Sequence, residues 1–168
     1  MTKEIFLIRH AKSSWANENL NDHDRPLNNR GIDAAKVMAN WLQFEIGSHI
    51  EVFHSSALRT TQTYIELKKN AAFSVNARSF KELYHASADT IINTAQKAKP
   101  TTHQLLIIGH NPGISEAVNA LCNSDIYHMP TLAIARIVFE VDDWKAVFPG
   151  TGMLKSLVTP KGLSPRTN

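Results

Sequence analysis

The chain has 168 residues, of which 43% are hydrophobic and 20% are charged, a composition typical of a single globular domain. The excess of 18 Lys and Arg over 15 Asp and Glu gives a net charge of only +3, scattered along the chain, so nucleic acid is not an expected partner. No apolar run approaches the roughly 20 residues that span a bilayer, and the first residues lack a signal peptide's apolar segment, so we expect a cytoplasmic protein outside the membrane.

Strand-like and helix-like patterns alternate along the chain. In chain order the expected elements are a strand (3–9), a helix (about 28–47), a strand (51–54), a helix (about 57–69), a strand (73–77), a helix (88–95), a strand (104–109), a helix (112–121) and a strand (132–141) with a possible partner at 146–148. Asn28 or Asn29, Ser55 or Ser56, and Asn111 are placed to cap the three longer helices.

This alternation predicts a three-layer α/β/α sandwich around a mainly parallel sheet. One domain is expected over residues 1–158. Residues 159–168 contain Pro160, Gly162 and Pro165 and are expected to form a loose tail.

Two of the expected strands are followed by histidine. Arg9 and His10 come at the end of the first strand, and His110 follows the strand at 104–109. Ligands of an open α/β sheet bind beyond the carboxyl ends of its strands, so the two imidazoles can meet at one ligand. The arginine beside His10 indicates that this ligand is an anion. Adjacent residues of an ideal strand point to opposite faces, so Arg9 and His10 share a site only if one of them lies in the turn.

Arg59 lies in the first turn of the helix at 57–69, where free backbone N–H groups and the helix dipole already favour an anion. Its guanidinium adds a fork that matches phosphate oxygens. Each of these residues alone is more often structural or solvated. Three strand-to-helix junctions of the same kind are hard to attribute to chance, so together they predict a phosphate site.

Three motifs carry a family resemblance: Ile8-Arg9-His10-Ala11, Ser55-Ser56-Ala57-Leu58-Arg59-Thr60-Thr61-Gln62-Thr63, and Gly109-His110-Asn111-Pro112. In this order they resemble the histidine phosphatase superfamily, which includes phosphoglycerate mutases. The segment from Asp22 to Gly31 and the short chain are most similar to the SixA-type phosphohistidine phosphatase branch. The resemblance runs from the first strand to about Cys122 and implies a phosphoglycerate mutase-like fold.

The resemblance implies a role for each of the main site residues. His10 would be the nucleophile that attacks phosphorus in line, forming a phosphohistidine that water then hydrolyses. Arg9, Arg59 and His110 would hold the phosphoryl oxygens, with no metal or other cofactor. The cations around His10 are expected to lower its pKa, so that the imidazole is neutral at pH 7.

Two further assignments have alternatives. Arg25 is implied to lie near the phosphate, but a structural role, holding its loop through Asp22 or Asp24, is equally open. Glu82 matches the general acid of family members that act on phosphate esters, and Asp22 is its rival. An imidazole leaving group needs less protonation than an alkoxide, so a phosphohistidine phosphatase can work with a weakly placed acid.

The leading prediction is a metal-independent phosphatase acting on a phosphohistidine-bearing protein, because so compact a chain has little length for an insertion that encloses a small metabolite. A phosphatase of a small phosphate ester is the alternative within the same chemistry. A phosphate-binding regulatory module without turnover is the alternative from another class. The histidines show no pair at the spacing of a zinc helix, so a metal-dependent hydrolase is not supported. Trp15 is a candidate for the rim of the site, and the oligomeric state is left open.

Overall fold

The computed structural model describes residues 1–163. Its strands are β1 (Lys3–Arg9), β2 (Ile50–Ser55), β3 (Ala77–Phe80), β4 (Gln104–Gly109), β5 (Ile134–Phe139) and β6 (Gly152–Val158). Its helices are α1 (Asn29–Glu45), α2 (Leu58–Ala71), α3 (Ala88–Ala95), α4 (Gly113–Cys122) and α5 (Pro160–Leu163). Three short 3-10 turns are η1 (Asp22–Asp24), η2 (Lys81–Leu83) and η3 (Trp144–Ala146).

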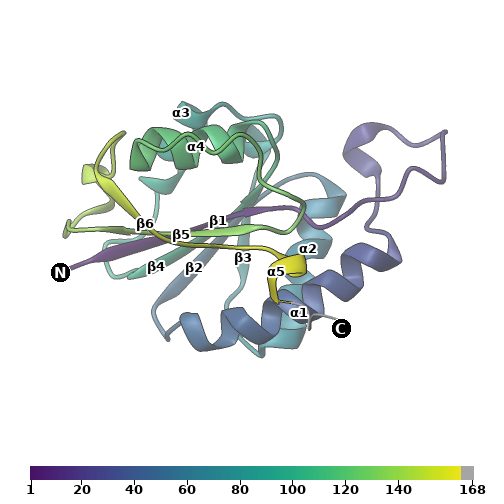
Figure 1. Cartoon of the computed structure of the whole chain (residues 1–168), viewed down its shortest axis with the longest axis horizontal. Coiled ribbons are helices and arrows are strands. Elements are labelled where there is room, and N and C mark those ends of the chain that lie inside the picture. Colours follow the sequence, from purple (N-terminus) through teal and green to yellow (C-terminus); the bar gives the residue numbers. More distant parts are fainter. Residues whose placement is uncertain (164–168) are drawn as a thin grey trace.

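The six strands form one sheet in the order β3-β2-β4-β1-β5-β6. The first four strands of this order pair in parallel, whereas β5 pairs antiparallel with β1 and with β6. Helices α3 and α4 cover one face, and α1, α2 and α5 cover the other (Figure 1). The expected three-layer sandwich with a mainly parallel sheet is therefore confirmed.

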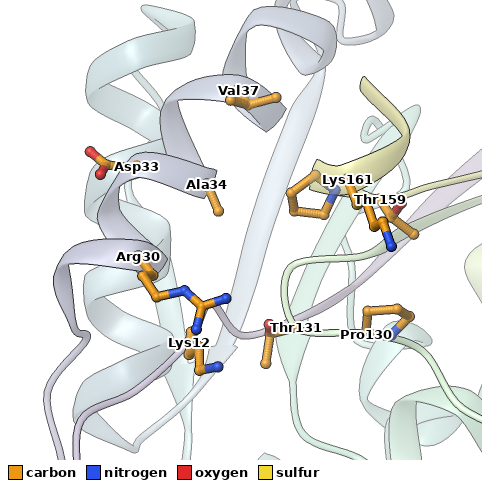
Figure 2. A pocket seen from close by; sticks show the side chains of 10 residues that line it. Lys12, Arg30, Asp33, Ala34, Val37, Pro130, Thr131, Thr159 and Lys161 are labelled. Carbon is orange, nitrogen blue, oxygen red and sulfur yellow. The ribbon is translucent and has the colours of Figure 1, made fainter. Parts of the chain in front are cut away.

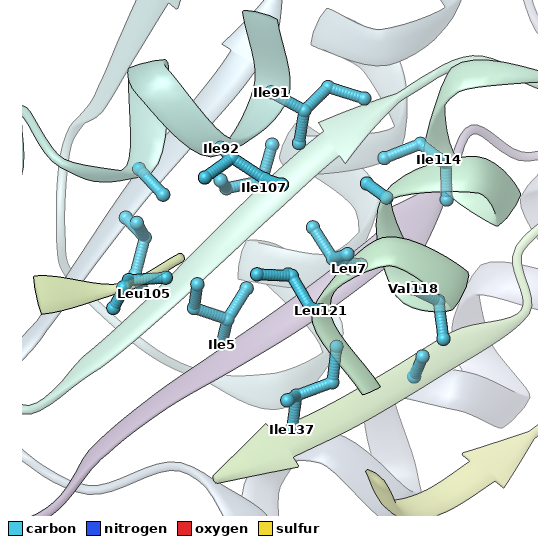
Figure 3. Close-up of a cluster of buried hydrophobic side chains, with 14 of the residues drawn as sticks. Ile5, Leu7, Ile91, Ile92, Leu105, Ile107, Ile114, Val118, Leu121 and Ile137 are labelled. Carbon is cyan, nitrogen blue, oxygen red and sulfur yellow. The ribbon is translucent and has the colours of Figure 1, made fainter. Parts of the chain in front are cut away.

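Strand β1 shows why both faces need helices. Ile5 and Leu7 belong to the buried cluster beneath α3 and α4, while Phe6 and Ile8 belong to the cluster beneath α1 and α2. Successive side chains of a strand point to opposite faces, so a continuous apolar run must be covered on both. Figure 3 shows the first cluster, in which side chains of β1, β4 and α4 meet.

Two boundary predictions differ from the structure. The strand expected at 73–77 lies at Ala77–Phe80, because the apolar side chains at 73 and 75 pack against the α1 and α2 cluster instead of pairing in the sheet. The strand that pairs with β5 is β6, at Gly152–Val158, and not the segment 146–148 expected from the sequence. Trp144 and Val147 are buried core residues, which explains the apolar run there.

The expected caps also differ in part. The Asn28 side chain accepts the Gly31 N–H and caps α1, as predicted. The caps of α2 and α4 are Ala57 and Pro112, and neither makes a side-chain cap hydrogen bond. The serine hydroxyls before α2 bond to histidine rings, Ser55 to His110 and Ser56 to His23, and Ser55 Oγ also accepts the Ala57 N–H.

The segment expected to be a loose tail begins with a short helix. Residues 160–163 form α5, which lies next to α1 (Figure 1). Residues 164–168 of that segment lie outside the described residues. Within residues 1–163, every helix is too short or too polar to cross a bilayer.

Candidate active site

Three strand ends deliver the central side chains to one edge of the sheet. His10 follows β1, His110 follows β4, and Arg59 lies in the first turn of α2, shortly after β2. Because β1 and β4 are parallel neighbours, with Arg9 opposite Gly109, the two histidines come next in register. Their ring centroids lie 5.2 Å apart.

Arg59 joins the two histidines. Its Nε donates to His10 Nε2 at 3.3 Å, and its Nη2 lies 3.3 Å from His110 Nδ1. All three residues are buried: Arg59 is 3% exposed, His10 is 8% exposed and His110 is 5% exposed. The structure thus brings these three predicted residues together, and β1 ends at Arg9, so His10 lies in the turn as the geometry requires.

The hydrogen bonds define the tautomer of His10. Its Nδ1 lies 2.7 Å from the carbonyl oxygen of Ala11, which can only accept, so Nδ1 carries the proton. A guanidinium can only donate, so the Nε2 that faces Arg59 carries the lone pair. The nucleophilic nitrogen of a neutral imidazole therefore points into the site.

The electrostatics of the site keep His10 neutral. Burial, followed by the charges of Arg59, Arg9 and Arg25, lowers its pKa to about 4, against the opposing hydrogen bond to Ala11. The predicted direction is confirmed, but the larger cause is burial and not the neighbouring cations. His10 is thus uncharged at pH 7.

His110 is held in a matching way. Its Nδ1 faces the Arg59 guanidinium and must accept, while Nε2 lies 2.7 Å from Ser55 Oγ and donates to it. Burial, then the charges of His10 and Arg59, lowers its pKa to about 3. Ser55, a predicted cap of α2, therefore orients His110 instead.

Arg9 is the fourth predicted residue, and its guanidinium is turned partly aside. Its Nη1 donates to the Met129 carbonyl at 2.9 Å and lies 3.0 Å from His128 Nε2. Among residues 1–163, its Nε is the one buried side-chain polar atom that has no hydrogen-bond partner. A buried donor without an acceptor is costly, and Arg9 reaches the His10 ring through its charge, which contributes to the lowered pKa of that ring.

The carboxylate of Asp22 occupies the cationic end of the site. Its Oδ2 accepts from Arg59 Nη2 at 3.0 Å and from the Tyr84 hydroxyl at 2.6 Å, and its Oδ1 accepts from Arg25 Nε at 3.1 Å. Burial raises the pKa of Asp22, but the hydrogen bonds from Tyr84 and Arg59 and the Arg59 charge lower it well below the usual carboxyl range. This carboxylate therefore takes up the Arg59 Nη2 donor.

Arg25 makes the structural contacts that the sequence offers as one of its two roles. It binds Asp22 and stacks on the indole of Trp15, with its guanidinium carbon 3.5 Å from the ring centroid. This is a structural role in the loop before α1. Its charge also contributes to the lowered pKa of His10, so it lies within electrostatic reach of that ring.

Glu82 is not brought to the site, which corrects its expected place there. Its carboxylate accepts from Lys97 Nζ at 2.7 Å on the surface, and this hydrogen bond lowers its pKa. Glu82 lies in the single turn η2, and the side chains that turn inward from this region are those of Leu83 and Tyr84. Asp22, its rival in the sequence, lies inside the site.

Two residues of the site, Tyr84 and His85, have no sequence signal of their own. The Tyr84 ring centroid lies 5.5 Å from that of His110, and the His85 ring lies 4.0 Å from Tyr84 and 5.9 Å from His110. Their proximity to Glu82 in the sequence is the available clue, since that segment is already expected near the phosphate.

A separate hollow of about 620 Å³ lies between α1 and α5 and is lined by Lys12, Arg30 and Lys161 (Figure 2). These cations are exposed, and none of the residues that line the hollow belongs to the His10 site. Its cations therefore provide control positions for substitutions that remove a positive charge from the His10 site.

Known proteins resemble this chain along most of its length. Residues 5–85 match the model of the histidine phosphatase superfamily, branch 1. An uncharacterised protein of Mycobacterium tuberculosis is 30% identical over 92% of this chain and 100% of its own length. The phosphohistidine phosphatase SixA of Escherichia coli is 27% identical over 82% of this chain and 86% of its own. A solved structure of the protein histidine phosphatase SixA, complexed with tungstate, has a TM-score of 0.81 at 26% identity and covers 96% of this chain and 99% of that one.

Proposed function

Because this chain belongs to the histidine phosphatase superfamily and is a phosphatase with a phosphoglycerate mutase-like fold, we propose that it works through a covalent phosphohistidine on His10, without a metal ion. We further propose that its substrate is a phosphohistidine carried by a protein. The small phosphate ester is the alternative substrate within the same mechanism.

The observation that carries the mechanism is the state of His10. Its Nδ1 donates a hydrogen bond to the Ala11 carbonyl, and its Nε2 lone pair faces Arg59 in a buried site. A neutral imidazole held this way can attack phosphorus without first losing a proton. The bond to Ala11 also stabilises the positive charge that the ring gains when phosphorus is attached.

The surrounding donors match a phosphoryl group in transfer. Arg59 contacts His10 and His110 at once, so a phosphoryl on His10 Nε2 lies within reach of its guanidinium. Arg9 Nε is a second donor, and it has no acceptor of its own. His110 Nδ1 becomes a donor once His110 takes a second proton, which a nearby dianion favours. Positioned cations of this kind stabilise the charge of the transition state.

An incoming phosphoryl group competes with the Asp22 carboxylate for Arg59. The two anions present similar oxygens to the same Nη2 donor, and the Asp22 side chain is 39% exposed, so it has a path outward. The free site is thus stabilised by an anion of its own, which the substrate replaces.

Two observations support a protein substrate. The loop beside the site carries Trp15, which is 74% exposed and is held by the Arg25 stack. An exposed, oriented indole is a frequent contact in protein interfaces. Two of the similar proteins are also named as phosphohistidine or protein histidine phosphatases.

The decisive experiment traps the phosphoenzyme. Wild type, His10→Ala and His54→Ala are mixed with a phosphohistidine protein labelled with ³²P and quenched in alkali, which preserves phosphohistidine. His54 is the matched control, since it is also buried and also lies 2.7 Å from the carbonyl of the next residue through Nδ1. Label is expected on wild type and His54→Ala and absent from His10→Ala.

The other outcomes separate the alternatives. Turnover by His10→Ala would overturn the covalent mechanism, and labelling without steady turnover would indicate a binding module. Faster turnover of simple esters than of the phosphoprotein would favour the small substrate. A chelator is expected to leave the rate unchanged. Arg59→Gln is expected to lose turnover, whereas Arg30→Gln, at the separate hollow, is expected to keep it.

A further inference from the structure

Neither carboxyl group that the sequence suggests as an acid can protonate a leaving group. Asp22 is held as a carboxylate by Tyr84, Arg59 and Arg25, and the bonds from Tyr84 and Arg25 still favour the carboxylate when a phosphoryl group takes its place on Arg59, so it has no proton to give. Glu82 lies outside the site and is bonded to Lys97. For a leaving group that needs a proton, such as an alkoxide, another side chain has to supply it.

His85 lies where such a group is needed. Its Nε2 is 3.6 Å from Asp22 Oδ2, the oxygen that accepts from Arg59 Nη2 and for which, under the proposed function, a phosphoryl oxygen competes. Its side chain is 61% exposed, so it borders the anion from the side of the solvent. In-line attack by His10 drives the leaving group away from the His10 ring. Because that ring is buried, the open direction is toward solvent, where the His85 side chain is exposed.

The fold holds His85 in this place by two local features. Its φ angle is +52°, a conformation that costs free energy in a residue with a side chain and often marks a functional position. The next residue, Ala86, lies so close to the start of α4 that a Cβ on Gly113 would stand 2.0 Å from its carbonyl oxygen. This close approach brings the segment carrying His85 against the helix that follows His110.

We infer that His85 is the acid and base of the reaction. In the first step, with His85 as the imidazolium, the His10 Nε2 lone pair forms the bond to phosphorus and the bond to the leaving atom breaks. The leaving atom keeps that electron pair and takes the His85 Nε2 proton, which leaves His85 as a neutral imidazole. In the second step water attacks phosphorus, the N–P bond pair returns to His10, and His85 accepts the proton of the water. Both histidines end as they began, and the product is inorganic phosphate.

This inference rests on the proposed covalent mechanism, and it predicts a dependence on the leaving group. A leaving group of low pKa departs without a proton, whereas an alkoxide needs one. Loss of His85 should therefore spare kcat/KM for p-nitrophenyl phosphate and phosphohistidine, because kcat/KM reports the step that forms the phosphoenzyme. It should lower kcat/KM for alkyl phosphates by about 100-fold, in the range of general acid catalysis, and lower kcat wherever hydrolysis of the phosphoenzyme limits turnover.

The test measures kcat/KM for a series of aryl and alkyl phosphates with wild type, His85→Asn and His85→Gly. Both replacements tolerate a positive φ, so the backbone is preserved. His103→Asn, an exposed histidine at the other end of β4, is the control. Added imidazole should restore alkyl phosphate hydrolysis in His85→Gly, where a space is left, more than in His85→Asn.

The outcomes are distinguishable from failure of the proposed mechanism. If wild type forms no phosphoenzyme, the covalent mechanism is wrong and this inference falls with it. Suppose that phosphoenzyme forms, but kcat/KM of the His85 variants depends on the leaving-group pKa as in wild type, or falls equally for all substrates without rescue by imidazole. In either case only the role of His85 is wrong. If wild type hydrolyses no alkyl phosphate at all, the role of His85 is also wrong, because a general acid in the site predicts that alkyl phosphates react.

Discussion

Replacing Asp22 by asparagine should tighten the binding of oxyanions. The Asp22 carboxylate shares Arg59 Nη2 with the incoming phosphoryl group, so in wild type the anion must displace it or bind beside a like charge. The amide introduced by Asp22→Asn keeps an oxygen for the Tyr84 hydroxyl and removes the charge. The variant therefore isolates the electrostatic competition from the loss of the hydrogen bond.

The size of the effect follows from Coulomb's law. Two unit charges about 4 Å apart repel by about 4 kcal/mol at an effective dielectric of about 20. Because the Asp22 side chain is 39% exposed and can turn outward, water and salt reduce this to about 1–2 kcal/mol. The dissociation constant should fall by roughly 5- to 30-fold.

The assay is calorimetric titration with tungstate, together with inhibition by inorganic phosphate, at one fixed ionic strength. Asp24→Asn is the matched control, because Asp24 lies in the same turn η1 and pairs with His23, outside the Arg59 cluster. Equal or weaker tungstate binding by Asp22→Asn would show that the carboxylate organises the site for the anion and does not compete with it.

Three other predictions test the remaining parts of the site. His110→Ala should lower kcat/KM for phosphohistidine by about 100- to 1,000-fold, or about 2.7–4 kcal/mol, and a loss below about tenfold would remove His110 from the charge-stabilising set. Burial, more than the nearby arginines, lowers the pKa of His10 to about 4, so between the ordinary value near 6.5 and 4 the unfolded chain binds more protons. The free energy of unfolding should thus fall as pH drops through this window, by roughly 3 kcal/mol for His10. Urea melts of His10→Ala should show a shallower fall than wild type, and parallel curves would contradict the buried neutral state. Trp15→Ala should reduce kcat/KM for a phosphoprotein about tenfold and spare small esters. Phe44→Ala, another exposed aromatic, is the control, and an equal loss on both substrate types would place Trp15 in the catalytic machinery and not in substrate docking.

The convergence of His10, His110 and Arg59 was predictable from the sequence. Each follows or begins a regular element whose pattern is local, and parallel strands send their carboxyl ends to one edge of the sheet. The separation of the two cores follows from the same kind of pattern, since a continuous apolar strand has to be buried on both faces.

The position of a side chain in a loop is harder to predict from the sequence. The position of Ser55 before α2 predicts a cap, but its hydroxyl lies against His110, 55 residues away in the chain. The strand expected at 73–77 differs from β3 because apolar side chains indicate burial and do not show whether their own segment is a strand or a loop.

The layered fold and the three cationic or imidazole groups at the strand ends can be read from the residue order alone, because local periodicity and chain direction fix both. Which acid enters the site depends on the folded chain. Asp22 and Tyr84 are 62 residues apart and form one hydrogen bond, while Glu82 turns to Lys97 at the surface. Such contacts depend on how loops from different strand ends pack together, and no periodic pattern records that packing.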